Sequence, residues 1–121
     1  MNHTMSYDEF LQNLDSFILT EEGNCPVTSV LSRLQGKWKL QIVYILCVKH
    51  TMRFGEFRKF FPAITNTMLT TALRNLEEEG IVHREQFNEI PPHVEYSLTQ
   101  KGKDLLPVFH AILNWGMKYV P

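Results

Sequence analysis

Five polar residues share one face of a predicted helix, and proteins use these residue types to hydrogen-bond to nucleic-acid bases and phosphates. On the opposite face, Leu69, Ala72, Leu73 and Leu76 form a stripe at helical spacing. Asn can bond adenine bidentately, Thr can bond to bases or phosphates, and Arg can bind phosphate or guanine. The same pattern also fits an ordinary solvated helix face, and the residues alone leave both interpretations open. The five residues are Asn66, Thr67, Thr70, Thr71 and Arg74.

Six cations are further candidates for contacts to phosphate groups, and a histidine near a predicted hairpin tip is a seventh residue of this kind. Surface Lys and Arg usually serve solubility, so we expect about half of them to be idle. We favour Arg84, which we place on a strand one step from the hairpin tip, where it could reach a nucleic-acid backbone or minor groove. The seven residues are Lys37, Lys39, Arg53, Arg58, Lys59, Arg84 and His93.

Cys25 immediately precedes Pro26, at the start of a predicted helix, where backbone N–H groups and the helix dipole stabilise a thiolate. A thiol in this position could sense oxidants. The alternative is a small residue that packs beside Trp38 or a partner subunit, as half-buried cysteines often do. Cys47 lies among apolar residues of a core helix, and we expect it to be structural.

Composition and charge limit the classes of function. The two cysteines and five scattered histidines lack the close spacing of a zinc site, so we expect no metal and no cofactor. The net charge is −1, but residues 1–24 contain five acidic residues and no Lys or Arg, so the other residues carry 12 basic and 8 acidic side chains. An acidic arm therefore precedes a mildly basic body. The start resembles no signal peptide and no apolar run is long enough to span a membrane, so we expect a cytoplasmic protein.

The first half of the chain predicts helices. Ser6 and Glu9 form a capping box before an apolar pattern that includes Phe10, Leu14, Phe17 and Ile18. Pro26 opens a second short helix, and a third runs from about Trp38 through Leu46. A short helix from Phe54 ends before Pro62, and Thr65 can cap a helix through about Glu79. The short turn between these last two helices predicts a helix-turn-helix.

The second half predicts a hairpin and a long helix. Residues 81–87 and 94–99 alternate with the period of strands, and the prolines between them stiffen a projecting tip. Thr99 can cap a last helix through about Tyr119, with a kink near Pro107. This helix is apolar nearly all round, and its surplus apolar surface is typical of a subunit interface. The fold class is therefore mainly α with a small β-hairpin: a winged helix-turn-helix with extra N- and C-terminal dimerisation helices.

Three segments carry a resemblance to a known family: "CPVTSVLSRLQGKWKLQIVYIL", "RFGEFRKFFPAITNTMLTTALRNLEEEGIV" and "PPHVEYSLTQKGKDLLPVFHAILNWG". In unbroken order from Cys25 to Gly116, they resemble the HxlR family of bacterial regulators, relatives of the MarR-type winged helices. The resemblance implies a family domain over residues 25–121, preceded by a member-specific acidic helical extension over residues 1–24. Thr67 departs from the family pattern, in which Lys or Arg is common, so one phosphate or guanine contact is expected to be missing.

The resemblance also implies a function: a homodimeric, sequence-specific DNA-binding regulator, a repressor more often than an activator, in which some relatives use a cysteine at the Cys25 position to sense oxidants. Its expected partners are double-stranded DNA, a second copy of the chain, and an unknown oxidant or small-molecule effector. The first alternative is a winged helix that contacts only proteins, consistent with the modest basicity. The second is an enzyme with Cys25 as nucleophile and His83 or His93 as base. No supporting motif accompanies those residues, so we expect no enzyme.

Overall fold

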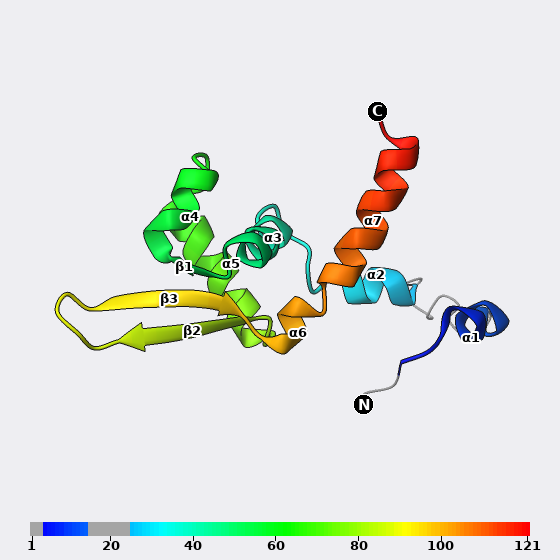
Figure 1. Ribbon diagram of the computed structural model, residues 1–121, viewed down its shortest axis with the longest axis horizontal. Helices are drawn as coiled ribbons and strands as arrows, with labels where there is room; N and C mark the ends of the chain where they lie inside the picture. Colours follow the sequence, from blue (N-terminus) through cyan, green and yellow to red (C-terminus); the bar gives the residue numbers. More distant parts are fainter. Residues whose placement is uncertain (1–3, 15–24) are drawn as a thin grey trace. The chain divides into compact units, whose positions relative to one another are not determined.

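The computed structural model describes residues 4–14 and 25–121, which fall into two compact units (Figure 1). We call Met1–Gln35 the N-terminal unit and Gly36–Pro121 the winged unit. The domain boundary after residue 24 stays a prediction. None of the helices in the described ranges has the length and apolar character needed to cross a membrane.

The N-terminal unit contains two short helices, α1 (Tyr7–Gln12) and α2 (Pro26–Leu31). The predicted capping box is confirmed: Glu9 N–H donates to Ser6 Oγ (3.1 Å), and Ser6 N–H donates to Glu9 Oε1 (3.3 Å). Pro26 begins α2 as predicted, where its missing N–H costs no helical hydrogen bond. The later part of the predicted α1 stripe, Phe17 and Ile18, lies outside the described residues.

The core of the winged unit forms where three helices meet: α3 (Lys39–Lys49), α4 (Phe54–Phe60) and α5 (Asn66–Glu78). Residues 61–65 join α4 to α5, and Thr65 Oγ1 accepts from Met68 N–H (3.1 Å) at the start of α5. The predicted helix-turn-helix is therefore confirmed. Its core consists of fully buried side chains from all three helices, among them Ile42, Leu46, Phe57, Leu69 and Leu76.

An antiparallel sheet of three strands accompanies the helices, with the order β1 (Thr51–Arg53), β3 (His93–Leu98), β2 (Val82–Phe87). The predicted hairpin is β2 and β3, which project beyond the helices in Figure 1. Strand β1 was not predicted, because three residues are too few to show a period of two. Strand β1 pairs with β3 and so joins the hairpin to the connection between α3 and α4. This pairing supports the hairpin, because two strands alone are only marginally stable.

The C-terminal segment forms two helices, α6 (Gln100–Lys103) and α7 (Leu106–Tyr119), so the prediction of one kinked helix was wrong. Pro107 has no N–H to donate to the Lys103 carbonyl, so the chain breaks at Asp104 and Leu105, and Pro107 lies in the first turn of α7. No residue of α7 is buried.

The junction between β3 and α6 lies against the turn between α5 and β2. Thr99 N–H donates to the Ile81 carbonyl (3.0 Å), and the Thr99 hydroxyl donates to the Gly80 carbonyl. The same hydroxyl oxygen accepts from Gly102 N–H (3.2 Å), which caps α6. A Cβ on Gly102 would collide with the Ile81 carbonyl oxygen and come within 3.2 Å of Ile81 Cγ2. We call these contacts the Thr99–Gly102 junction.

Gly102→Ala should therefore destabilise the protein by about 2 kcal/mol, because the added methyl meets backbone that cannot move aside. Urea unfolding followed by circular dichroism measures the change. Gly55→Ala is the matched control: a Cβ at Gly55 meets nothing within 4 Å, so its free energy of unfolding should stay within about 0.5 kcal/mol of the wild type. Equal stability of both variants would contradict the close approach.

Candidate nucleic-acid interface

Helix α5 separates its side chains into a buried stripe and an exposed polar face. Leu69, Ala72, Leu73 and Leu76 are 0–7% exposed and pack into the core. The residues predicted for base and phosphate contacts lie on the exposed face, where solvent or a ligand can reach them. They are Asn66, Thr67, Thr70, Thr71 and Arg74.

Three of the predicted contact residues come together in one groove between α5 and the sheet: Thr70, Arg74 and Arg84. Arg74 and Arg84 therefore line the same surface, although they lie ten positions apart in the sequence. We call this surface the arginine groove; its remaining lining residues are Phe54, Leu73, Glu77 and Tyr96.

The position of Arg84 differs from the prediction. Strand β2 continues to Phe87, so Arg84 is three residues from its end rather than one step from the tip. Arg84 pairs with Tyr96, which pairs in turn with Met52 on β1. Side chains of paired residues lie on the same face of a sheet, so this row runs from buried Met52 to exposed Arg84. The sheet thus directs Arg84 toward α5 and not toward the tip.

Glu77 is a lining residue of the arginine groove that sequence analysis missed. Glu77 follows Thr70 by seven residues and Arg74 by three, and this helical spacing places all three on one face. The spacing alone could therefore have placed Glu77 beside the predicted contact residues. The carboxylate lowers the positive potential of the groove and can orient the nearby guanidinium groups.

Asn66, at the start of α5, is held by a residue of α4. Arg58 Nη1 donates to Asn66 Oδ1 at 3.2 Å. The amide oxygen keeps a second lone pair and the amide nitrogen keeps its donors, so Asn66 can still bond a base edge. Two of the predicted contact residues are therefore coupled, and Arg58 limits the rotation of the Asn66 side chain.

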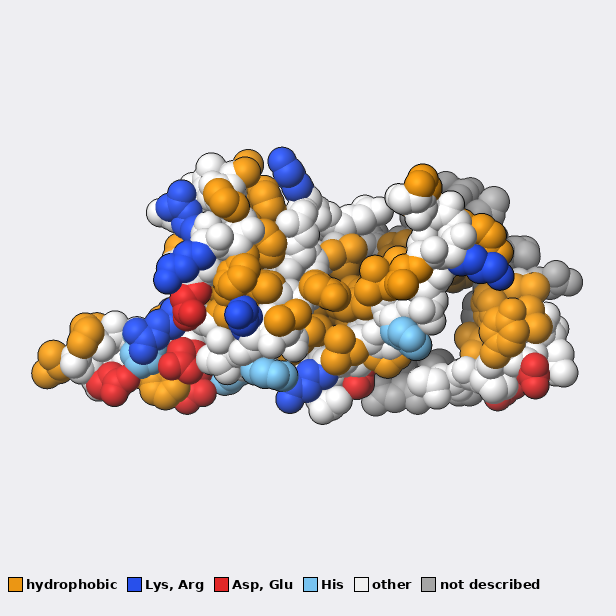
Figure 2. Space-filling model, turned by 45° about the horizontal axis from the view of Figure 1, so that its top comes forward, with side chains coloured by type: hydrophobic (Ala, Val, Ile, Leu, Met, Phe, Trp, Pro, Cys, Tyr) orange, Lys and Arg blue, Asp and Glu red, His pale blue; other side chains and the backbone are white. Residues whose placement is uncertain are grey.

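The other predicted cations are more dispersed. Arg53 lies on β1 opposite Glu95, and Lys59 is exposed in the last turn of α4. Figure 2 shows Lys and Arg side chains gathered over the α4 side of the winged unit, with acidic side chains near them toward the hairpin of β2 and β3, which we call the wing. Lys37 lies over the ring of Trp38 (5.2 Å), and the Lys39 side chain lies beside Gly36. Neither of these two lysines lines the arginine groove.

His93 is the first residue of β3 rather than part of the tip, and two carboxylates flank its ring. Nδ1 lies 3.1 Å from Glu89 Oε1, and Nε2 lies 2.8 Å from Glu95 Oε2. The ring also stacks on Phe87, with centroids 4.8 Å apart. A phosphate would compete with both carboxylates for this side chain, so the geometry disfavours the predicted phosphate contact.

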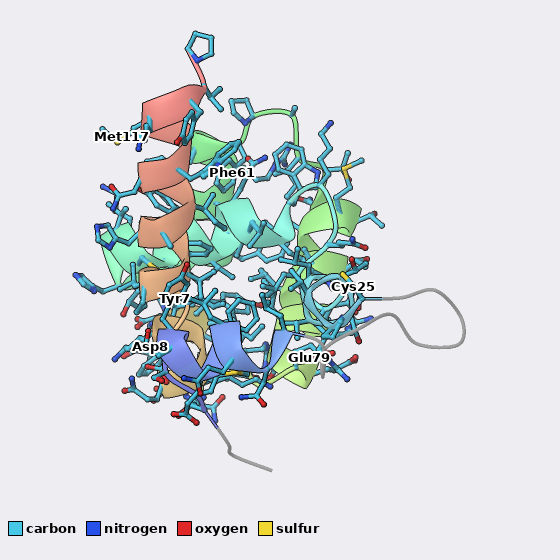
Figure 3. All side chains as sticks on the ribbon, turned by 90° about the vertical axis from the view of Figure 1, so that its right-hand side faces the viewer. Tyr7, Asp8, Cys25, Phe61, Glu79 and Met117 are labelled. Carbon is cyan, nitrogen blue, oxygen red and sulfur yellow. The ribbon has the colours of Figure 1, made fainter. Side chains whose placement is uncertain are left out.

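The Cys25 thiol caps α2. Its Sγ accepts from Thr28 N–H (3.3 Å) and lies 2.9 Å from Thr28 Oγ1 (the residue is labelled in Figure 3). The hydrogen bond with the Thr28 hydroxyl, helped by the Thr28 N–H, lowers the pKa of the Cys25 thiol. In contrast, burial raises the pKa of the Cys47 thiol. The two free cysteines therefore differ in thiolate character, whereas the role of Cys25 as a sensor stays a prediction. Across residues 4–14 and 25–121, no cluster of three His, Cys, Asp or Glu side chains could hold a metal ion.

Comparison with known proteins agrees with the helix-turn-helix described above. The family model described as "HxlR-like helix-turn-helix" matches residues 33–121. The chain is 48% identical over 95 residues to YdeP of Bacillus subtilis, described as an uncharacterized HTH-type transcriptional regulator, covering 78% of this chain and 73% of YdeP.

Two similar solved structures are of regulators in a stated redox form. One is titled "Redox regulator HypR in its oxidized form"; it is 44% identical, has a TM-score of 0.70, and the match covers 80% of this chain and 99% of HypR. The other is the reduced form of the transcriptional regulator YodB from B. subtilis, which is 34% identical with a TM-score of 0.71 and coverage of 80% and 95%. Both folds agree with the winged helix-turn-helix described above.

Cys25 should react with iodoacetamide several-fold faster than Cys47 near neutral pH, because its lowered pKa gives it the larger thiolate fraction. As the pH falls, both thiols become protonated, and the rate for Cys25 should decline at a lower pH than the rate for Cys47. Mass spectrometry of the labelled peptides measures both rates in one sample.

Thr28→Val removes the hydroxyl partner and should slow the alkylation of Cys25, whereas Ser29→Ala, which leaves both Thr28 contacts in place, should not. Equal rates for Cys25 and Cys47 in the wild type would show that the thiolate at Cys25 is not stabilised.

Proposed function

This chain belongs to the HxlR-like helix-turn-helix family, and we propose that it is a homodimeric transcriptional regulator that binds specific double-stranded DNA sequences through α5 and the wing. One observation carries the proposal: α5 buries its leucine stripe, exposes a polar face, and shares a groove with an arginine of the wing.

In this proposal the exposed face of α5 enters the major groove of DNA. Asn66, Thr67, Thr70 and Thr71 occupy its N-terminal half, the part of a recognition helix that meets base edges. Arg74 and Arg84 lie further from that end and contact phosphates on one strand. Loop 88–92 of the wing reaches the sugar-phosphate backbone or the neighbouring minor groove.

The apolar surface of α7 supports the dimer. Trp115 and Met117 are 63% and 82% exposed, and Figure 3 shows Met117 pointing away from the rest of the winged unit. Beside α7 lies an apolar groove of about 370 Å³, lined almost wholly by carbon atoms. Exposed apolar surface of this extent is typical of a protein interface, and we assign it to the α7 helix of a second copy. The groove is lined by Leu40, Gln41, Tyr44, Ile45, Phe61, Phe109, Ile112 and Leu113.

A two-fold dimer would bind a pseudo-palindromic site with half-sites about one helical turn, or roughly 34 Å, apart. The resemblance to the HxlR family favours repression over activation, so we propose a repressor. A rotation of the two winged units would spoil the half-site spacing and release the DNA.

The thiol of Cys25 is the proposed redox input. The titles of two similar structures describe a redox regulator and a diamide-treated regulator, and Cys25 is the thiol with the lowered pKa. A peroxide would oxidise the Cys25 thiolate to a sulfenic acid with release of an alcohol or water. The added oxygen would alter the hydrogen bonds that Cys25 makes with Thr28 at the start of α2.

The rival function is a winged helix that contacts only proteins. Glu77 in the arginine groove and the carboxylates beside His93 favour it, because they weaken attraction to phosphates. Salt dependence separates the two functions, since DNA binding releases counterions and weakens steeply with salt.

Arg74→Ala and Arg84→Ala should each weaken binding to the DNA upstream of the protein's own gene by about tenfold, and removing one arginine from a phosphate should reduce the salt slope by about one. Fluorescence anisotropy at several salt concentrations measures both quantities. Lys118→Ala, at the far end of α7, removes the same charge and should leave affinity unchanged. Unchanged affinity in both arginine variants would refute the assigned interface.

Ile112→Asp should weaken self-association by about tenfold or more, because it places a carboxylate in the apolar groove that we assign to the second copy. Ile112 is 56% exposed, so the variant should keep its helical content. Sedimentation velocity measures the dimer, and Ile90→Asp at the fully exposed wing tip is the control. Unchanged self-association of the Ile112 variant would show that the dimer interface lies elsewhere.

A further inference from the structure

The side chains of Arg58 and Asn66 join the two helices of the helix-turn-helix. Arg58 lies in the last turn of α4, Asn66 is the first residue of α5, and Arg58 Nη1 donates to Asn66 Oδ1 (3.2 Å). An Asn near the start of a helix often caps it by accepting from a backbone N–H. Here Thr65 Oγ1 accepts from Met68 N–H instead (3.1 Å), so the cap does not use the Asn66 side chain.

The hydrogen bond determines which end of the Asn66 amide faces Arg58. A guanidinium group contains only N–H donors, whereas the amide has an acceptor, Oδ1, at one end and a donor, Nδ2, at the other. If the amide were turned over, two donors would meet and the bond would be lost. Arg58 therefore holds Oδ1 toward α4 and leaves the N–H groups of Nδ2 for a ligand.

Arg58 also keeps N–H groups for a ligand, because a guanidinium has several and only one nitrogen, Nη1, bonds Asn66. In the part of the chain that the structure describes, no carboxylate pairs with Arg58. The acidic residue of α4, Glu56, accepts from Arg53 N–H (2.9 Å). In a helix-turn-helix the first helix crosses the DNA backbone, so Arg58 carries its exposed charge on the helix that meets phosphates.

We propose that Arg58 is a positioning residue for base reading: it binds a DNA phosphate and at the same time holds Asn66 so that Nδ2 donates to a base. Adenine, guanine and thymine each present an acceptor in the major groove, whereas cytosine presents only the N4 donor. Asn66 therefore favours the first three bases and discriminates against cytosine at one position of each half-site. A phosphate contact of α4 thereby sets a base preference of α5.

This inference rests on the proposed function, because base reading requires α5 to enter the major groove. Its structural basis, the orientation of Asn66 by Arg58, exists without DNA. The first test therefore uses the free protein, so that failure of the proposed function and failure of this inference give different results.

In the free protein, Arg58→Met should release the Asn66 side chain, because Met has an unbranched stem but no N–H donor. NMR three-bond couplings that report χ1 of Asn66 should show one dominant rotamer in the wild type and an average over several rotamers in the variant. Lys59→Met, at the next position of α4, is the matched control and should keep the dominant rotamer. Equal averaging in the wild type and in Arg58→Met would overturn the positioning.

With DNA, a site selected by the wild type from a random library defines the half-site, and fluorescence anisotropy then measures the affinity for each base at each position. At one position, cytosine should weaken binding by the wild type about tenfold. Arg58→Met should reduce this difference to about twofold, because a freely rotating amide can turn Oδ1 toward cytosine N4. Lys59→Met should change the affinity for all four bases by the same factor, since a phosphate contact carries no sequence information.

Asn66→Asp should reverse the preference. The carboxylate still accepts from Arg58, but a second acceptor replaces the Nδ2 donor, so cytosine should become the preferred base at the same position. A negative charge in the first turn of a helix is favourable, so this variant should keep its fold.

The outcomes separate the two claims. A wild type that selects no common motif would overturn the proposed function, and with it base reading by Asn66, whatever the couplings of the free protein show. A selected motif whose discrimination against cytosine survives Arg58→Met would overturn this inference alone. An unchanged base preference in Asn66→Asp would do the same.

Discussion

The winged unit depends on the close approach of Gly102 to the Ile81 carbonyl, where two distant segments share hydrogen bonds. Thr99 donates through its N–H to Ile81 and through its hydroxyl to Gly80, and its hydroxyl oxygen also caps α6. Lys101 adds a bond to the Glu79 carbonyl at 2.6 Å. The end of α5, the start of β2, the end of β3 and the start of α6 are thereby fixed as one body. A side chain at residue 102 would force these elements apart.

This junction links the arginine groove, the apolar surface of α7 and a cavity that lies between them. Strand β2 leaves it in a register that pairs Arg84 with Tyr96, so that Arg84 shares a groove with Arg74 of α5. The chain beyond α6 breaks before Pro107 and begins α7, whose apolar side chains remain exposed. The cavity lies between the two, with Ser97 on one side and Leu106 on the other. A second subunit and DNA would therefore act on the same short stretch of backbone.

Much of the fold follows from the sequence because it is encoded locally. Helix α5 carries its cap at Thr65 and its leucine stripe within one segment, and both its extent and its buried face were predicted correctly. Strand β1 and the break before α7 were missed, since three residues show no period and a proline can either kink a helix or begin one. The neighbours of Arg84 depend on strand register, which a hairpin sequence with a five-residue loop does not determine. Glu77 could have been placed from helical spacing, whereas the cavity lined by Ser97 and Leu106 is formed by five elements and has no local signal in the sequence.

The central claim is that α5 and the wing bind specific DNA as parts of a symmetric dimer. The most direct test is selection from a random library of double-stranded DNA by the full chain at about 0.15 M salt, where non-specific contacts are weakened. The account predicts enrichment of one inverted repeat whose half-sites are centred about 10 base pairs apart. Recovery of sequences with no common motif after repeated rounds would contradict it and would leave the winged unit as a surface for other proteins.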